Sequence, residues 1–312
     1  MRGKLMRNVV LAIKEETTYG TDSTPTTAAN SILARVSDAQ PVEAEFAERN
    51  NIKPYLGSSG KVAVSYMSRI TVEVELAGAS AAGTVPGWGA LLKACGMGET
   101  VVASTSVTYK PVSSSFKSVS IYYFLDGLRH KMLGCMGNAS LNLNARGIPT
   151  ITIQFTGLYS ATTDTSLPTD SDYSAFLAPL AVNKVNTAAF TLHGVASTPF
   201  DQFSIDLGNS VVYRNMPNLE EVMITDRKAS GSITIPQTSV ATKAWHTAVK
   251  NGTLDSFSMT HGATAGNVFT ISAPKVQLAG VQEVEKDGVA MYQFALDLQP
   301  NAGNDELSIA IT

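Results

Sequence analysis

Thr150-Ile151-Thr152-Ile153-Gln154-Phe155-Thr156 decides the fold, because apolar and polar side chains alternate along its whole length. Successive side chains of a β-strand point to opposite faces, so a period of two indicates a strand with one buried and one polar face. The same alternation recurs at 71–76, 118–123 and 140–144. Asp126-Gly127 lies between two such runs and is typical of a hairpin turn. The sequence therefore predicts a mainly β protein with antiparallel strands.

Two short helices are predicted beside the strands, each with a tryptophan near its start and a glycine after its end. Apolar residues recur at intervals of three and four, the spacing of one helix face. About ten residues are too few for a helix to persist alone, so each tryptophan is expected to anchor its helix against a sheet. The two sets are Trp88, Leu91, Leu92 and Cys95 before Gly96, and Trp245, Ala248 and Val249 before Gly252.

The composition excludes several classes of protein. Charged residues make up 16% of the 312 residues and the net charge is -3, which argues against a protein built to hold nucleic acid, since phosphate binding needs clustered Lys and Arg. Cys95 and Cys135 are too few for a disulfide framework, and reduced, buried thiols are expected. No run approaches the roughly 20 apolar residues of a membrane helix, and the apolar run near the N-terminus is too short for a signal peptide.

An internal duplication is predicted from pairs of residues that recur at nearly one offset. In addition to these pairs, the order of strand, helix, hairpin, strand, turn and strand is the same in both halves. The first half has an extra segment at 97–116, after which Gly147 corresponds to Gly288. The expected organisation is an N-terminal arm at 1–30, a first domain at 31–158, a polar linker at 159–185 and a second domain at 186–312. The anchor pairs are Tyr55 and Tyr213, Arg69 and Arg227, and Trp88 and Trp245.

A series of short motifs gives the chain a resemblance to a known family. In this order they resemble the major tail, or tail tube, proteins of bacteriophages with long, non-contractile tails. No single motif is diagnostic, and the specificity comes from the series, which covers nearly the whole chain. The motifs are KEETTYGTD at 14–22 with TPT at 24–26, RNNIKPYLG at 49–57, EVELAG at 73–78, Trp88 with LLKACG at 91–96, LHG at 192–194, VYRN at 212–215, ITDRK at 224–228 and GNDEL at 303–307.

The resemblance implies two tandem β-sandwich domains, each flanked by one short helix, in a structural protein of the virion tail. Domains of this family form rings of six in which one sheet of each joins a continuous barrel around a lumen, and the rings stack into a tube that conducts DNA. Two domains in one chain imply a trimeric ring with pseudo-sixfold symmetry. The implied partners are further copies, the tape measure, tail terminator and distal tail proteins, and DNA that passes without specific binding. Assembly in the host cytoplasm, no membrane, no cofactor and no enzymatic activity are expected.

Four carboxylates are candidates for the wall of the lumen, namely Glu43, Glu45, Glu73 and Glu75. An acidic wall repels phosphate, so DNA passes without sticking. Alternation defines a face but not its direction, so an outward, solvent-facing position for these residues stays open. The segment 97–116 and the N-terminal arm are expected to make contacts between rings.

Alternative functions are weaker. His130, His193, His246 and His261 have no metal-ligand spacing, and a zinc site from His130, Cys95 and Cys135 lacks the usual close ligand pairs. No nucleophile elbow or phosphate loop is present. The second hypothesis is a tandem β-sandwich of the tail tip or fibre that recognises a cell-surface ligand. Such a binding module is expected to show clustered aromatic residues on loops, and the sequence shows no such cluster.

Overall fold

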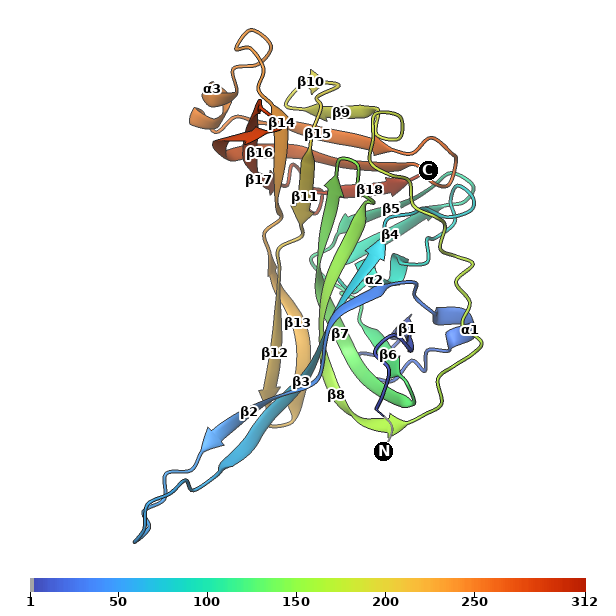
Figure 1. Ribbon diagram of the computed structural model, residues 1–312, viewed down its shortest axis with the longest axis vertical. Coiled ribbons are helices and arrows are strands. Elements are labelled where there is room, and N and C mark those ends of the chain that lie inside the picture. Colours follow the sequence, from blue (N-terminus) through green and yellow to red (C-terminus); the bar gives the residue numbers. More distant parts are fainter. Residues whose placement is uncertain (1–2) are drawn as a thin grey trace.

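The computed structural model describes residues 3–312, so Met1 and Arg2 of the expected N-terminal arm lie outside the described residues. Strands dominate the described part, and its helices are short, which confirms the predicted mainly β class (Figure 1). None of the described helices has the length and apolar character needed to cross a membrane. The helices are α1 Thr27–Asn30, α2 Gly89–Lys93 and α3 Trp245–Lys250.

The strands of the two halves follow one another in the same spatial order. In the first half the neighbours run β1-β6-β7-β8-β3-β2, and in the second half they run β9-β15-β16-β17-β14-β11, all antiparallel. The first-half strands are β1 Val9–Glu15, β2 Arg35–Glu48, β3 Lys61–Glu75, β4 Met97–Val102, β5 Ser106–Pro111, β6 Val119–Leu125, β7 Leu128–Asn144 and β8 Thr150–Asp164. The second-half strands are β9 Ala189–Leu192, β10 Val195–Ala196, β11 Gln202–Asp206, β12 Asn209–Met216, β13 Leu219–Arg227, β14 Ser230–Pro236, β15 Leu254–His261, β16 Phe269–Lys286, β17 Val289–Gln299 and β18 Ser308–Ile311.

The hairpin predicted at Asp126-Gly127 joins β6 to β7, and both residues have the positive φ of a tight hairpin turn, 41° and 93°. Asp287-Gly288 forms the corresponding turn between β16 and β17, with φ of 53° and 77°.

One predicted anchor pair, Arg69 and Arg227, does not occupy matching positions in the two sets of paired strands. The offset that matches Gly147 with Gly288 also matches Thr156 with Asp297. Thr156 lies opposite Arg69 and Asp297 lies opposite Ser230, so Ser230, and not Arg227, occupies the position that corresponds to Arg69.

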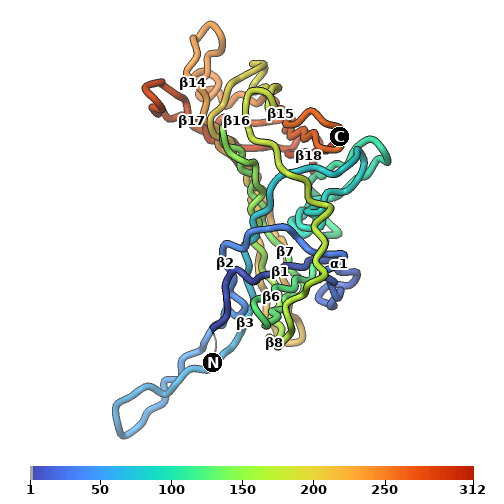
Figure 2. The backbone as a smooth tube through the Cα atoms, turned by 45° about the vertical axis from the view of Figure 1, so that its right-hand side comes forward, coloured from blue at the N-terminus to red at the C-terminus, as the bar shows by residue number. Residues whose placement is uncertain are grey.

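The two halves share one sheet and one core. β11 pairs with β14 on one side and with β7 on the other, and β18 pairs with both β16 and β5. A single apolar cluster contains buried side chains from both halves. Within it, the Trp88 ring stacks on Phe269 of the second half with centroids 6.3 Å apart. The segment after β8 runs along the side of the molecule to β9, and its Val182 is buried (Figure 2).

Two segments expected to be loops form strands instead. β1, inside the expected N-terminal arm, pairs with β6 and buries Leu11 and Ile13. The segment 97–116 contains the β4–β5 hairpin, whose Val107 and Tyr109 are buried and which pairs with β18. In both cases the strand is stabilised by partners far away in the sequence. The two predicted helices are shorter than expected, and each is followed by the predicted glycine at positive φ, Gly96 at 74° and Gly252 at 60°.

Replacement of Trp88 by alanine is predicted to destabilise both halves together. The Trp88 side chain is 1% exposed, its Nε1 donates to the Ala77 carbonyl oxygen at 2.8 Å, and its ring contacts Tyr109 and Phe269. Loss of a buried tryptophan costs about 3–5 kcal/mol. Urea unfolding is expected to show this loss in a single transition, whereas exposed Val240→Ser stays near wild type. Two separate transitions, or a cost like that of Val240→Ser, contradicts a shared core.

Candidate functional site

A run of eight neighbouring strands, β16-β17-β14-β11-β7-β8-β3-β2, forms a wall through both halves of the molecule. One face of the wall is apolar and covers the core. On β8, for example, Ile151, Ile153 and Phe155 are buried, while Thr152 and Gln154 lie on the other face. The alternation read from the sequence thus separates a dry face from a polar face.

The register of the wall places polar side chains side by side across all eight strands. Each strand gives one member, and every member is a charged, hydroxyl or amide residue. Three members are acidic and one is basic, so the row lacks the clustered Lys and Arg that phosphate binding requires. The polar row consists of Arg35, Glu73, Thr152, Ser140, Asp206, Ser230, Asp297 and Gln277.

Asp206 fixes the row where the two halves meet. Its carboxylate accepts hydrogen bonds from Asn138 Nδ2 at 2.8 Å, from the Gly208 N–H at 2.6 Å and from the Ser140 hydroxyl. Gly208 has φ of 66°, and a Cβ there would lie 1.9 Å from the Lys228 carbonyl oxygen. Only glycine fits this point, where β11 ends and the chain turns into β12.

The four predicted acidic residues fall into two groups. Glu73 belongs to the polar row and lies 3.6 Å from Arg35, and Glu75 is exposed two residues further along the same face. Glu43 and Glu45 lie lower on the β2–β3 hairpin. There Glu43 forms an ion pair with Arg69 at 3.1 Å, and Glu45 accepts a hydrogen bond from the Ser65 hydroxyl at 2.8 Å.

The two predicted helix anchors are both buried beside their helices. Trp88 lies just before α2 and donates from Nε1 to the Ala77 carbonyl oxygen. Trp245 begins α3 and donates from Nε1 to the Thr238 hydroxyl at 2.9 Å, and its ring packs on Phe294 with centroids 5.4 Å apart.

The distal part of the β2–β3 hairpin, residues 42–66, extends away from the body and is called the arm below (Figure 1). Its tip carries Ile52 and Leu56, whose side chains are 103% and 102% exposed, and Tyr55, which is 66% exposed. Apolar groups gathered on a projection are typical of a surface that another protein covers. Sequence reasoning missed the arm because residues 50–60 show no alternation and read as a loop.

The corresponding hairpin of the second half, β12–β13, packs against the first half instead. Val222 and Ile224 form a small apolar cluster with Met136 of β7. Tyr19 accepts a hydrogen bond at its hydroxyl from the Val222 N–H. The loop that carries Tyr19 is held by buried Glu16, which accepts hydrogen bonds from the Gly20 and Gly134 N–H groups and from two serine hydroxyls. The second hairpin is therefore seated by contacts within the chain.

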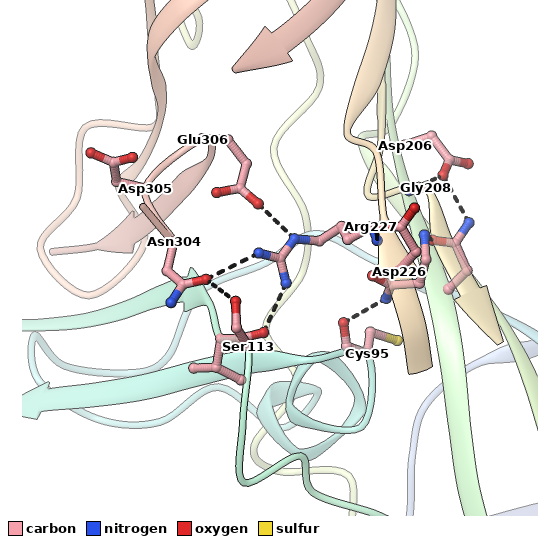
Figure 3. A network of polar contacts seen from close by, with 12 residues as sticks. Cys95, Ser113, Asp206, Gly208, Asp226, Arg227, Asn304, Asp305 and Glu306 are labelled. Atoms are coloured by element: carbon pink, nitrogen blue, oxygen red, sulfur yellow. Dashed lines mark hydrogen bonds and ion pairs between the residues drawn. The ribbon is translucent and has the colours of Figure 1, made fainter. Parts of the chain in front are cut away.

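Arg227, at the end of β13, contacts two segments that are distant from it in the sequence (Figure 3). Its Nε donates to Glu306 at 2.6 Å, Nη1 donates to the Val112 carbonyl oxygen at 2.8 Å, and Nη2 donates to Asn304 at 3.3 Å. The Arg227 and Glu306 side chains are only 12% and 8% exposed. Two of the motifs read from the sequence, 224–228 and 303–307, thus meet in one nearly buried ion pair.

No group of three or more potential metal ligands occurs within residues 3–312. Cys95 and Cys135 are free thiols in the core, and burial raises the pKa of both. The His130 ring hydrogen-bonds the Thr162 hydroxyl at the surface. His193 and His261 are buried, and burial lowers the pKa of both, which favours the neutral imidazole. These groups serve packing and hydrogen bonding in the folded chain.

Comparison with known proteins agrees with the resemblance read from the motifs. The sequence model of a family described as phage tail tube protein matches residues 6–300. That match covers nearly the whole chain, including the wall, the arm and Arg227, and it ends before the Arg227 partners Asn304 and Glu306. A comparison with curated proteins gives no match.

Replacement of Arg227 by methionine is predicted to destabilise the fold strongly. It leaves the Glu306 carboxylate buried without its cation, which costs about 3–5 kcal/mol for a buried pair. The double variant Arg227→Met/Glu306→Gln removes the stranded charge and is expected to recover part of this loss. As a matched control, Lys61→Met breaks the Lys61–Glu48 pair, whose side chains are 57% and 65% exposed, and an exposed pair contributes at most about 1 kcal/mol. Equal unfolding free energies for the two single variants contradict the prediction.

Proposed function

This chain belongs to the phage tail tube protein family, and from that premise we propose that it polymerises as stacked rings into a tube that conducts DNA. Membership makes it a structural component of the phage tail that assembles with its own copies and with other tail proteins. The observation that carries the proposal is the polar row, an unbroken line of polar side chains across both halves with the core behind it. A tube wall needs such a sheet, wet on one face and packed on the other.

The polar face of the wall is proposed to line the lumen. Hydroxyl and amide groups hydrate without attracting phosphate, and Glu73, Asp206 and Asp297 outnumber Arg35 in the row. Strong binding of DNA depends on cations that replace counterions, so this surface lets DNA pass without holding it. Glu73 and Glu75 lie on this face, while Glu43 and Glu45 belong to the arm.

Three copies are proposed to complete each ring. The shared strand order supports a duplicated tube domain, with repeats at 31–158 and 186–312 joined through 159–185. Each chain then fills two of six equivalent positions, which gives a trimer with pseudo-sixfold symmetry. Free thiols at Cys95 and Cys135 suit assembly in the host cytoplasm. The tape measure, tail terminator and distal tail proteins are the proposed further partners, and the role is structural rather than enzymatic.

The arm is proposed to join one ring to the next. It leaves the body beyond the end of the wall, and its tip exposes Ile52 and Leu56 completely. Burial of these side chains against another ring offers about 1.5–3 kcal/mol for each. The N-terminal arm and the segment 97–116 stay further candidates for such contacts, and within the chain β1 pairs with β6 and β5 pairs with β18.

Negative-stain electron microscopy of the concentrated protein tests the proposed function. Rings with a central hole, and tubes built from them, are the expected result, with threefold or pseudo-sixfold class averages. Particles that stay monomeric at every protein and salt concentration, even when short tail fragments are added as seeds, contradict it.

The double substitution Ile52→Ser/Leu56→Ser is predicted to weaken ring stacking while leaving single rings intact. The loss of apolar burial between rings is expected to raise the protein concentration at which tubes appear, as measured by sedimentation and microscopy. Val240→Ser, which removes an exposed apolar group outside the arm, is the matched control. Normal tubes at the normal concentration from the double variant exclude the tip as a stacking contact.

A further inference from the structure

The chain contains one example of how a second half joins a first half. β11 pairs antiparallel with the end of β7, so that Gln202 lies opposite Asn144 and Asp206 lies opposite Ser140. β11 stands at the edge of the second-half strand order, and the end of β7 is the part of that strand beyond its pairing with β6. The wall is continuous between the halves because these two edges meet.

The counterparts of these two edges lack a backbone partner in the described part of the chain. In the first half the place of β11 is taken by β2, which pairs only with β3. In the second half the place of the end of β7 is taken by residues 280–286 of β16, which pair only with β17. No residue of either edge is buried; each is exposed or half-buried. Unpaired N–H and C=O groups along an edge strand are a template for another strand.

We propose that β2 of one copy pairs antiparallel with residues 280–286 of β16 in a second copy, repeating between chains the junction that β11 and β7 form within the chain. The inference rests on the proposed ring function and names the surfaces that close the ring. A second copy is the occupant because the internal junction already shows which edge fits which.

The ladders fix the register of this junction. Gln40 lies opposite Arg69, and Asp206 lies opposite Ser230. Because Arg69 and Ser230 occupy corresponding positions in β3 and β14, Gln40 corresponds to Asp206. Gln282 lies opposite Gln293, and Ser140 lies opposite Thr152. Because the offset that matches Gly147 with Gly288 also matches Thr152 with Gln293, Gln282 corresponds to Ser140. Since Asp206 lies opposite Ser140 within the chain, Gln40 of one copy lies opposite Gln282 of the next.

One further feature of the β2–β3 ladder agrees with this register. The β2–β3 ladder shifts immediately after Gln40, just as the β11 ladder ends at Asp206, and Pro41, which has no N–H to donate, follows at that point. The register brings Arg35 opposite Lys286. Each of these cations already has a carboxylate partner in its own chain, Glu73 and Asp201, so their mutual repulsion is reduced.

Disulfide trapping with the double variant Gln40→Cys/Gln282→Cys tests the proposal. Cβ atoms directly opposite each other on paired strands are about 4.5–5.5 Å apart, so a small adjustment brings two thiols within disulfide distance. The native thiols Cys95 and Cys135 are fully buried and do not compete. Oxidation of the assembled protein is expected to give a covalent trimer as the main product on a non-reducing denaturing gel, and reduction is expected to return the monomer.

The matched control is Gln40→Cys/Glu283→Cys, in which the second thiol lies one residue away and on the opposite face of β16. It is expected to give little or no trimer. A covalent dimer from Gln40→Cys alone overturns the proposal, because it means that two β2 edges meet each other.

Microscopy of the same reduced samples separates this inference from the proposed function. Tubes without cross-links contradict the β2–β16 junction alone and leave tube formation standing. Cross-links in a protein that forms no tubes support the junction and contradict tube formation. The absence of both contradicts both.

Discussion

The antiparallel hydrogen bonds between β11 and β7 turn two sheets into one wall, and the placing of the core on one side of that wall follows from them. Because side chains alternate along every strand, the register at this junction aligns the apolar face of the second half with that of the first. Trp88 then stacks on Phe269 across the boundary, and β18 pairs with β5. The carboxylate of Asp206 and the glycine at 208 shape the junction itself. A slip of one residue would turn the polar row into the core.

The low content of charged residues in the chain is explained by the function proposed for the wall. A long sheet that is to form a channel needs one hydrated face, yet clustered cations there would hold DNA and clustered anions would repel each other across a narrow space. Serine, threonine and glutamine supply hydration without either effect, and they make up half of the polar row. The two long hairpins, β12–β13 and β2–β3, differ in what they contact. The β12–β13 hairpin is fixed on its own chain by Tyr19 and Met136, whereas the arm leaves its apolar tip free for another copy.

Local patterns predicted the local structure well. The period of two at 150–156 and 71–76 and the turn at Asp126-Gly127 are confirmed, because each depends on neighbouring residues alone. The sequence predicts an arm and a loop where β1 and β5 form, because the pairing of these strands with β6 and β18 involves distant residues. The segments 224–228 and 303–307 stand out as motifs, but nothing in either segment indicates that Arg227 and Glu306 form an ion pair. Alternation likewise predicts that Glu73 lies on the polar face of its strand. Only the pairing of the strands shows that Glu73 lies in one row with Asp206 and Asp297.

A cryo-electron microscopy reconstruction of assembled tubes, at a resolution that traces strands, would show directly which face of the wall lines the channel. We expect three copies in each ring, with Thr152, Ser140, Asp206 and Asp297 facing the central channel and the apolar face of the wall turned towards the core of each subunit. A ring whose channel is lined by other strands, with the polar row on its outer surface, would contradict it.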